Sequence, residues 1–137
     1  GNSDSHKAMP IVNENIKKLY LNDFATFRGI KCNFVMTAHI LFKKIDPYFV
    51  ATQSNKIINK IIRKKIGFKG LIISDDISMK ALKGDILSNA KNSLKSGCNL
   101  ILYCRGKYNE SATILKGLRK IDNFTIKKTQ QFYEFLR

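Results

Sequence analysis

The fold of this chain is decided by residues 70–79, which read GLIISDDISM. Leu71, Ile72 and Ile73 form a short apolar run between a glycine and a serine, as is typical of a strand buried on both faces of a parallel sheet. Asp75 and Asp76 follow at the carboxyl end of that strand, where α/β proteins place their active sites. Two buried negative charges need hydrogen bonds or helix N-termini to offset their desolvation. From the residues alone, catalysis and simple capping of the next helix are equally good interpretations of the pair.

Similar units lie on either side of this stretch. Residues 33–39 (NFVMTAH) and residues 99–103 (NLILY) each predict a further strand. Apolar residues at three- and four-residue spacing predict helices between and beyond the strands. The expected helix limits are Asn13 to Gly29, Ser54 to Gly67, Asp85 to Gly97, an N-cap at Asn109, and residues 123–137.

The order of elements is therefore a loop, a helix and three strand–helix units. Strands joined by helical crossovers pair in parallel with a right-handed connection. A closed (β/α)8 barrel needs eight such units. Three of them make either a small open α/β domain or a piece of something larger, and buried-type strands at both edges would leave backbone groups unpaired.

Composition indicates one globular domain. The chain has 137 residues, of which 44% are hydrophobic, and this is enough for a real core. No apolar run approaches the roughly 20 residues of a membrane helix, and nothing resembles a signal peptide. Cys32, Cys98 and Cys104 form an odd set without zinc-finger spacing, which favours core filling in a reducing compartment. We therefore expect a cytoplasmic protein without a membrane partner.

The net charge of +15 is large and would favour polyanions such as nucleic acid or an acidic membrane surface. The lysines are spread along the whole chain, however, and no homeodomain, zinc-finger, RNA-recognition or helix-turn-helix signature accompanies them. A general compositional bias explains such a pattern as well as a binding face does. We therefore do not expect nucleic-acid binding to be the main role.

Side chains suited to acid–base chemistry end the strands and occupy the N-terminal loop. His39, the two carboxylates and Arg105 follow the three strands, so parallel pairing would bring them to one rim. In the loop, Asp4 lies two residues before His6, where it can hydrogen-bond the imidazole of a proton donor or acceptor. Taken alone, His6 is better explained as a solvated histidine, and His39 as a satisfied buried one.

Two kinds of chemistry suit carboxylates on such a rim. Glycoside hydrolysis needs one group that attacks or stabilises the oxocarbenium-like sugar carbon and another that protonates the leaving oxygen. Asp75 is nearer the strand than Asp76, and its better fixed position suits a nucleophile. Hard cations also take carboxylate oxygens. Adjacent side chains of a strand point to opposite faces, however, which makes joint ligation by the pair awkward.

Four stretches of the chain form an ordered set. They are residues 4–6 (DSH) with 9–10 (MP), 35–39 (VMTAH), 51–54 (ATQS) and 66–79 (IGFKGLIISDDISM), and residues 97–100 (GCNL) continue the series. Each motif alone is weak, but together they cover about the first 105 residues. In order and spacing the set resembles bacterial β-N-acetylhexosaminidases of glycoside hydrolase family 3, the enzymes of peptidoglycan recycling.

The resemblance implies a retaining mechanism and assigns its residues. Asp75 would be the nucleophile, and His6 would be the general acid/base, with Asp4 as its orienting partner. The implied substrate is a terminal β-linked N-acetylglucosamine on a cell-wall muropeptide, and we expect His39 and Met79 to bind it. Neither a metal nor an organic cofactor is implied.

The match is limited to the last three strand–helix units of the family's (β/α)8 barrel and the catalytic loop before them. The family's KHFPGHG stretch is expected just before Asp4, where Gly1, Asn2 and Ser3 stand. We therefore expect one incomplete TIM-type α/β barrel domain over residues 1–137, with a catalytic loop at 1–12, strand–helix units at 13–122 and a C-terminal helix at 123–137.

The expected function is removal of terminal β-linked N-acetylglucosamine by a truncated glycosidase that is weakly active or inactive alone, since lost contacts to the sugar cost orders of magnitude in rate. Besides the muropeptide, the expected partners are a complementing N-terminal barrel half or a second copy of the chain. Two alternatives stay open: a non-catalytic remnant that binds a partner protein, and a basic nucleic-acid-binding module.

Overall fold

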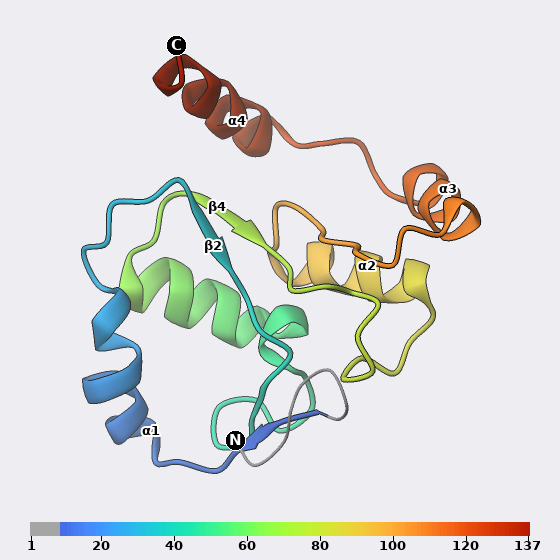
Figure 1. The fold of residues 1–137 in the computed structure, drawn as a ribbon. Helices are drawn as coiled ribbons and strands as arrows, with labels where there is room; N and C mark the ends of the chain where they lie inside the picture. The colour runs from blue at the N-terminus through green and yellow to red at the C-terminus, as the bar shows by residue number, and fades with distance from the viewer. Residues whose placement is uncertain (1–8) are drawn as a thin grey trace.

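The computed structural model describes residues 9–137, which form an α/β fold around a short parallel sheet (Figure 1). Strand β2 (Phe34–Met36) pairs in parallel with β4 (Leu71–Ile73). An isolated parallel bridge joins Ile73 to Leu100 on the other side of β4. The predicted parallel arrangement of the three segments is thereby confirmed, and β4 lies between the other two.

The third segment is less regular than predicted. The backbone N–H of Asn99 donates to the carbonyl of Ile72 at 2.7 Å, and the backbone N–H of Ser74 donates to the carbonyl of Leu100 at 3.0 Å. Beyond that point the Leu102 N–H bonds the hydroxyl of Ser74, at 2.9 Å, in place of a backbone carbonyl. The segment thus follows β4 without forming a full strand, because a side chain takes over part of the ladder.

Two short strands were missed. Residues 11–12, predicted as loop, form β1 (Ile11–Val12), which pairs in parallel with β3 (Leu41–Phe42). Runs of two residues carry too little alternation to be recognised in a sequence. Residues 1–8 of the predicted N-terminal catalytic loop lie outside the described residues.

Helices and helical turns account for about half of the remaining described residues. In chain order they are α1 (Ile16–Lys18), the π-helical turn η1 (Leu19–Asp23), the 3₁₀ turns η2 (Ala25–Phe27) and η3 (Ala51–Gln53), the π-helix η4 (Lys56–Ile66), α2 (Ile86–Ser96), α3 (Tyr108–Gly117) and α4 (Asn123–Phe135). None of the helices in the described part of the chain combines the length and apolarity that a bilayer crossing requires.

Most helix ends agree with the sequence patterns. Asp85 caps α2 by accepting from the Ser88 N–H at 2.9 Å, and Gly67 and Gly97 end η4 and α2 with positive φ angles of 81° and 117°. Ser54 accepts from the Ile57 N–H at 3.2 Å near the start of η4.

Two predicted caps are wrong. Asn15, not Asn13, caps α1, and the predicted helix up to Gly29 is broken into α1, η1 and η2. Helix α3 has Lys107 at its cap position without a side-chain hydrogen bond, so Asn109 lies inside the helix. Asparagine suits several positions around a helix start, and its presence alone does not choose among them.

The core lies on both sides of the sheet. On one side, Ile58 of η4 packs with Ile72 of β4 and with Cys98, all of which are buried. Gly70 permits the close approach of β2 and β4, since a Cβ there would collide with the carbonyl oxygen of Asn33. A second cluster, which includes Ile77, joins the segment after β4 to α2 and α3.

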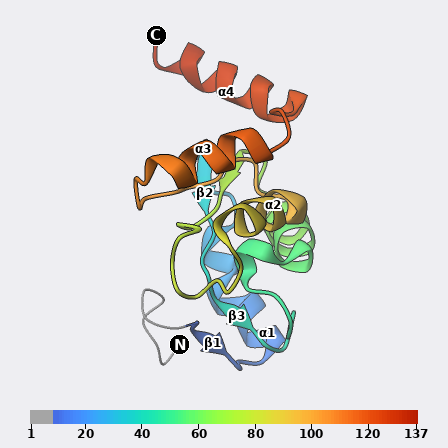
Figure 2. The same cartoon turned by 90° about the vertical axis from the view of Figure 1, so that its right-hand side faces the viewer.

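The two ends of the strands face different surroundings. Helix α4 lies beside the amino ends of β2 and β4, where Phe132 makes an edge contact with Phe34 at a centroid distance of 4.8 Å (Figure 1). Strands β1 and β3 lie at the opposite end of the molecule from α4 (Figure 2). The carboxyl ends of β2 and β4 are therefore free of α4, and the candidate site lies there.

Candidate active site

The carboxyl ends of the three parallel segments meet at one rim. The Asp75 N–H, after β4, donates to the hydroxyl of Thr37, after β2, at 3.3 Å. The Cys104 N–H, after the third segment, donates to Asp76 Oδ1 at 3.1 Å. Arg105 Nη2 donates to the carbonyl of Ser78 at 3.2 Å. The structure thus brings together Asp75, Asp76 and Arg105, three of the strand-end residues that the sequence placed on a common rim.

Asp76 is a structural carboxylate. Its Oδ1 accepts from the backbone N–H groups of Ser78 and Cys104, at 3.0 and 3.1 Å, and its Oδ2 accepts from the Ser78 hydroxyl at 2.7 Å. Burial raises the pKa of the Asp76 carboxyl, but these hydrogen bonds outweigh that effect and hold the pKa below its usual value. Asp76 is therefore ionised near neutral pH, with both oxygens committed to the turn that follows β4.

Asp75 is held differently. Its Oδ1 accepts from the N–H of Asp76 at 2.8 Å, which fixes the orientation of the carboxylate, and its side chain is half-buried. Within the described residues this is the one hydrogen bond that the Asp75 carboxylate receives. Asp75, rather than Asp76, is therefore the member of the pair with acceptor capacity left for a further partner.

His39 lies beneath the rim and not on it. The imidazole is fully buried, with Nδ1 at 2.9 Å from the Thr52 hydroxyl and Nε2 at 2.8 Å from the carbonyl oxygen of Asp76. Met79 is also buried, and its N–H donates to the same carbonyl at 3.1 Å. Both residues support the backbone of Asp76, and their expected contact with a substrate stays a prediction.

Thr37 and Thr52 are functional candidates that the sequence interpretation missed. Thr52 lies in the matched stretch 51–54 without an assigned role, and Thr37 follows β2 beside His39. Their hydroxyls lie 2.9 Å apart, and both residues are buried. The signal that could have found them is a threonine placed directly after the apolar run of a strand or just before a helix. A hydroxyl that becomes buried at such a place needs a hydrogen-bond partner.

Cys104 is exposed at the rim but is not poised as a nucleophile. Desolvation raises the pKa of its thiol, and the negative charges of Asp76 and Asp75 raise it further. The thiolate, which is the reactive form, is therefore disfavoured near neutral pH.

The described residues give little support to a metal site at the aspartate pair. Across residues 9–137, no group of three or more His, Cys, Asp or Glu side chains lies close enough to hold an ion. Both oxygens of Asp76 already accept hydrogen bonds. A cation would therefore rest mainly on the single carboxylate of Asp75.

The predicted proton donor, His6, and its orienting residue, Asp4, lie outside the described residues. Their assignment therefore stays a prediction. The rim itself supplies one carboxylate of defined orientation, Asp75, on a backbone that is hydrogen-bonded on both sides.

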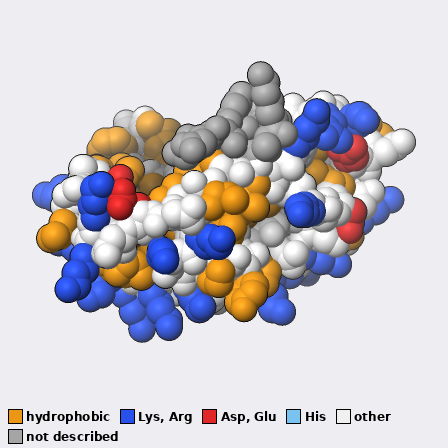
Figure 3. All heavy atoms as spheres, turned by 90° about the horizontal axis from the view of Figure 1, so that it is seen from below, with side chains coloured by type: hydrophobic (Ala, Val, Ile, Leu, Met, Phe, Trp, Pro, Cys, Tyr) orange, Lys and Arg blue, Asp and Glu red, His pale blue; other side chains and the backbone are white. Residues whose placement is uncertain are grey.

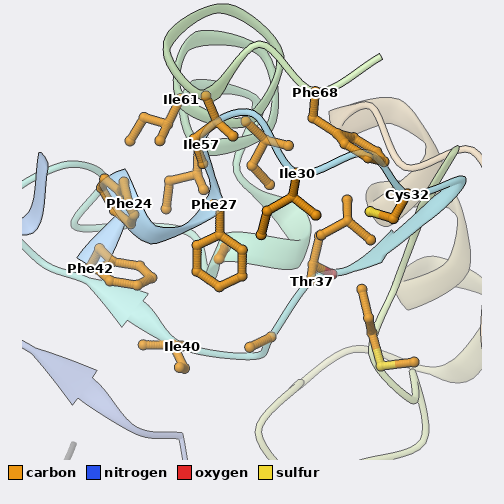
Figure 4. A pocket seen from close by; sticks show the side chains of 16 residues that line it. Phe24, Phe27, Ile30, Cys32, Thr37, Ile40, Phe42, Ile57, Ile61 and Phe68 are labelled. Carbon is orange, nitrogen blue, oxygen red and sulfur yellow. The ribbon is translucent and has the colours of Figure 1, made fainter. Parts of the chain in front are cut away.

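An apolar hollow lies beside this rim, between η2, β2 and η4 (Figure 4). Phe27 and Ile30 line it from one side, and Ile57 and Ile61 from the other. Neither Asp75 nor Asp76 lines it. The hollow is thus separate from the carboxylates, and its chemistry does not suit a sugar, which needs polar partners.

The positive charge of the chain is distributed. On the face drawn in Figure 3, Lys and Arg side chains lie at several separate places, with apolar side chains between them. This face therefore gives no support to the nucleic-acid alternative.

Comparison with known proteins bears directly on this site. The model of the glycosyl hydrolase family 3 N-terminal domain matches residues 1–131. The beta-hexosaminidase of Methylobacillus flagellatus is 34% identical over 109 residues, which are 74% of this chain and 30% of that protein. The beta-hexosaminidase of Psychromonas ingrahamii is 30% identical over 137 residues, which are 96% of this chain and 38% of that protein. The chain thus spans about a third of the length of these curated relatives.

Solved structures show the same relationship. The crystal structure of CbsA from Thermotoga neapolitana superimposes with a TM-score of 0.84 and 27% identity, over 99% of this chain and 34% of that one. NagZ from Neisseria gonorrhoeae gives a TM-score of 0.80 and 28% identity, over 93% of this chain and 38% of that one. The parallel α/β arrangement found here is that of the TIM-barrel-like family domain, and the chain belongs to the glycosyl hydrolase family 3 N-terminal domain family.

Proposed function

We propose that this chain carries the nucleophile of a retaining β-N-acetylhexosaminidase that removes terminal β-linked N-acetylglucosamine from cell-wall muropeptides in the cytoplasm. The observation that carries the proposal is the contrast within the aspartate pair. Asp76 has both oxygens bonded, whereas Asp75 has a fixed orientation and spare acceptor capacity at the carboxyl end of β4. Such strand ends are where barrel enzymes hold their reactive groups.

The substrate class is supported by the relatives. Among the solved structures that resemble this chain, NagZ from Neisseria gonorrhoeae has been crystallised in complex with N-trifluoroacetyl-D-glucosamine, at 28% identity and a TM-score of 0.77. The crystal structure of the beta-N-acetylglucosaminidase from Thermotoga maritima also resembles this chain, at 29% identity. We infer the same sugar for the site around Asp75.

In the proposed reaction, Asp75 attacks the anomeric carbon while His6 gives its proton to the glycosidic oxygen. The bond to the leaving sugar breaks and a covalent glycosyl–Asp75 ester forms. His6, now neutral, then takes a proton from water, whose oxygen attacks the same carbon and releases Asp75. Asp4 orients His6 in both steps, and His39 and Met79 hold the Asp76 backbone against the nucleophile.

The activity is proposed to need more of the barrel than this chain supplies. No strand among residues 9–137 pairs with the outer edge of β2, where Met36 is 54% exposed. Phe27 and Ile30, at 51% and 52% exposure, line the apolar hollow beside that edge. An unpaired parallel edge next to apolar side chains suits a further strand. We infer that the chain is part of an incomplete (β/α)8 barrel and that the corresponding N-terminal barrel half completes it along β2.

Hydrolysis of a chromogenic N-acetyl-β-glucosaminide tests the proposal, measured for the chain alone and with an N-terminal barrel half from a relative. We expect activity to appear or rise strongly on complementation and to disappear with Asp75→Asn. Asp122→Asn, which removes a charge from the cap of α4 at the other end of the strands, is the matched control and should leave activity intact. Activity that survives Asp75→Asn unchanged would show that Asp75 is not the nucleophile.

A further inference from the structure

A single chain of hydrogen bonds runs beneath the candidate nucleophile. It begins at the Asp75 N–H, which donates to Thr37 Oγ1 at 3.3 Å, and continues to Thr52 Oγ1, 2.9 Å away. From Thr52 it passes to His39 Nδ1 at 2.9 Å, and it ends where His39 Nε2 meets the carbonyl oxygen of Asp76 at 2.8 Å. The chain therefore ties together the backbone on both sides of the aspartate pair.

The direction of every donor in this chain follows from its last member. A carbonyl oxygen accepts only, so His39 Nε2 must carry the hydrogen. In a neutral imidazole Nδ1 is then an acceptor, and the Thr52 hydroxyl donates to it. Thr52 in turn accepts from the hydroxyl of Thr37, and a lone pair of Thr37 accepts the Asp75 N–H. All bonds point the same way, which leaves each hydroxyl with one donated and at least one accepted bond.

If His39 were a doubly protonated imidazolium, the donor direction of the bonds between His39, Thr52 and Thr37 would be reversed. With a hydrogen on Nδ1, Thr52 would donate to Thr37, and the Thr37 hydroxyl would have only the carbonyl of Ile73 left, at 3.4 Å. That distance is near the limit of a hydrogen bond, whereas the contact between the two threonines is 2.9 Å. The geometry therefore favours the neutral, Nε2-protonated form of His39.

Thr52 is the only member of this chain that comes from outside the strand ends. It lies on η3, and it is fully buried. The turn is fixed from the α2 side, since the Ser96 hydroxyl donates to the carbonyl of Gln53 at 2.7 Å and the Cys98 thiol contacts the carbonyl of Thr52 at 3.7 Å. The Thr52 hydroxyl is thus held in place independently of the aspartates that it supports.

We propose that Thr52 is a positioning residue for the nucleophile: its hydroxyl donates to His39 Nδ1 and orients the Thr37 hydroxyl, and through them it fixes the backbone of Asp75 and Asp76. The inference rests on the proposed role of Asp75, but the state of His39 can be measured without any enzymatic activity. A hydroxyl is needed because the position requires a donor and an acceptor on one atom. Valine has the same shape and neither function.

The first test uses nuclear magnetic resonance on the chain itself, with long-range ¹H–¹⁵N correlations of the imidazole. We expect a protonated Nε2 and an unprotonated Nδ1 for His39 in the wild type and in Thr52→Ser. In Thr52→Val we expect Nε2 to stay protonated, since the Asp76 carbonyl still accepts from it, but the Nδ1 signal of His39 should shift because Nδ1 loses its hydrogen-bond donor. The amide signals of Asp75 should shift with it. Thr125→Val is the matched control, because Thr125 is equally buried and its hydroxyl bonds Asn99 at the other end of the strands.

The second test is kinetic and uses the complemented enzyme. Thr52→Val should lower kcat on the order of tenfold to a hundredfold with little change in KM, since misplacement of a reacting group costs rate and not sugar binding. Thr52→Ser should restore most of the loss, and Thr125→Val should leave kcat near that of the wild type.

The outcomes separate the two claims. If the His39 Nδ1 and Asp75 amide signals of Thr52→Val match those of the wild type, or if Thr125→Val shifts them as strongly, the positioning role is wrong. If these signals shift as expected but no complemented protein hydrolyses the sugar, the hydrogen-bond chain stands and the proposed function fails. Urea unfolding shows whether Thr52→Val folds, and Thr52→Ala, which also lacks the hydroxyl, carries the test if it does not.

Discussion

The two ends of the parallel strands are built in opposite ways. At the amino end, the Arg63 guanidinium donates to the carbonyls of Gly70 and Phe68, at 2.6 and 3.1 Å, and to Asn99 Oδ1 at 2.7 Å. At the carboxyl end, the half-buried Asp75 carboxylate accepts one hydrogen bond within the described residues. One end uses its charged group to join segments, and the other keeps a charged group available.

The amino-end network also includes α4. Arg63 lies over the rings of Phe68 and Phe124, at 5.6 and 5.4 Å from their centroids, and Asn99 donates to the Thr125 hydroxyl at 3.1 Å. Desolvation lowers the pKa of the Arg63 guanidinium, but an arginine with so high an ordinary value stays charged at neutral pH. Its three charge-assisted hydrogen bonds and two ring contacts make it the main polar tie between η4, β4 and α4.

The two ends of the sheet therefore differ in role: the amino end joins segments, and the carboxyl end holds the candidate reactive group. Barrel-type domains stabilise the amino ends of their strands and place chemistry at the carboxyl ends. Here that rule can be tested with substitutions, because each end has one residue whose loss should affect one property and spare the other.

Asp75→Asn should have the largest effect of all, and on activity alone. We expect the complemented enzyme to lose a thousandfold or more in kcat/KM, which is about 4 kcal/mol. The free energy of unfolding, measured with urea, should change little, since the amide still accepts from the Asp76 N–H. A loss of stability as large as the loss expected for Arg63→Ala would contradict the proposed difference between the two ends of the strands.

Arg63→Ala should have the largest effect on stability. It removes the donor to two half-buried carbonyls and the contacts with two rings, and we expect a cost on the order of 3 kcal/mol in unfolding free energy. The exposed Arg119, whose nearest carboxylate contact is 3.8 Å long, is the control, and Arg119→Ala should cost at most about 0.5 kcal/mol. Equal costs for the two variants would show that the amino-end network contributes no special stability.

Asp76→Ala should affect both properties, the stability of the fold and the activity. It removes the acceptor of three hydrogen bonds, and we expect a loss of about 1–3 kcal/mol in unfolding free energy together with a loss of activity through the displaced backbone of Asp75. Amide hydrogen exchange should show the damage at residues 76–79 and 104. Protection that is unchanged at these residues would mean that the Asp76 carboxylate does not hold the turn.

The smallest effect is a dependence of stability on pH. Because the folded-state pKa of Asp76 lies below its usual value of 3.8, its carboxylate contributes stability above about pH 4 and loses it as the pH falls through the folded-state pKa. The difference in unfolding free energy between the wild type and Asp76→Asn should therefore be larger at pH 6 than at pH 3. A difference that is constant or larger at pH 3 would contradict the hydrogen-bonded, ionised state.

The sequence was most informative where a property is local. The apolar run at residues 71–73, the cap at Asp85 and the glycine at 97 each act over a few residues, and the structure confirms the segments they predict. The aspartate pair was placed on the correct rim by the same local logic.

What the sequence could not supply depends on contacts between distant residues. The Thr37–Thr52 and Arg63–Asn99 hydrogen bonds join residues that are 15 and 36 positions apart. No local sequence pattern around these residues predicts such pairs. The use of the Ser74 hydroxyl in the ladder, which shortens the third strand, depends in the same way on Leu102. Which carboxylate of the pair is free was therefore visible only after the partners of Asp76 were known.

The most direct test of the central claim is to trap the covalent intermediate. The complemented enzyme would be incubated with a fluorinated N-acetylglucosaminyl fluoride, which forms the glycosyl-enzyme faster than it hydrolyses, and then digested and analysed by mass spectrometry. We predict one added sugar on the peptide that contains residues 70–79, at Asp75, and none in Asp75→Asn. A label on Asp76 or on any other residue, or turnover without a label, would contradict the assignment of Asp75 as the nucleophile.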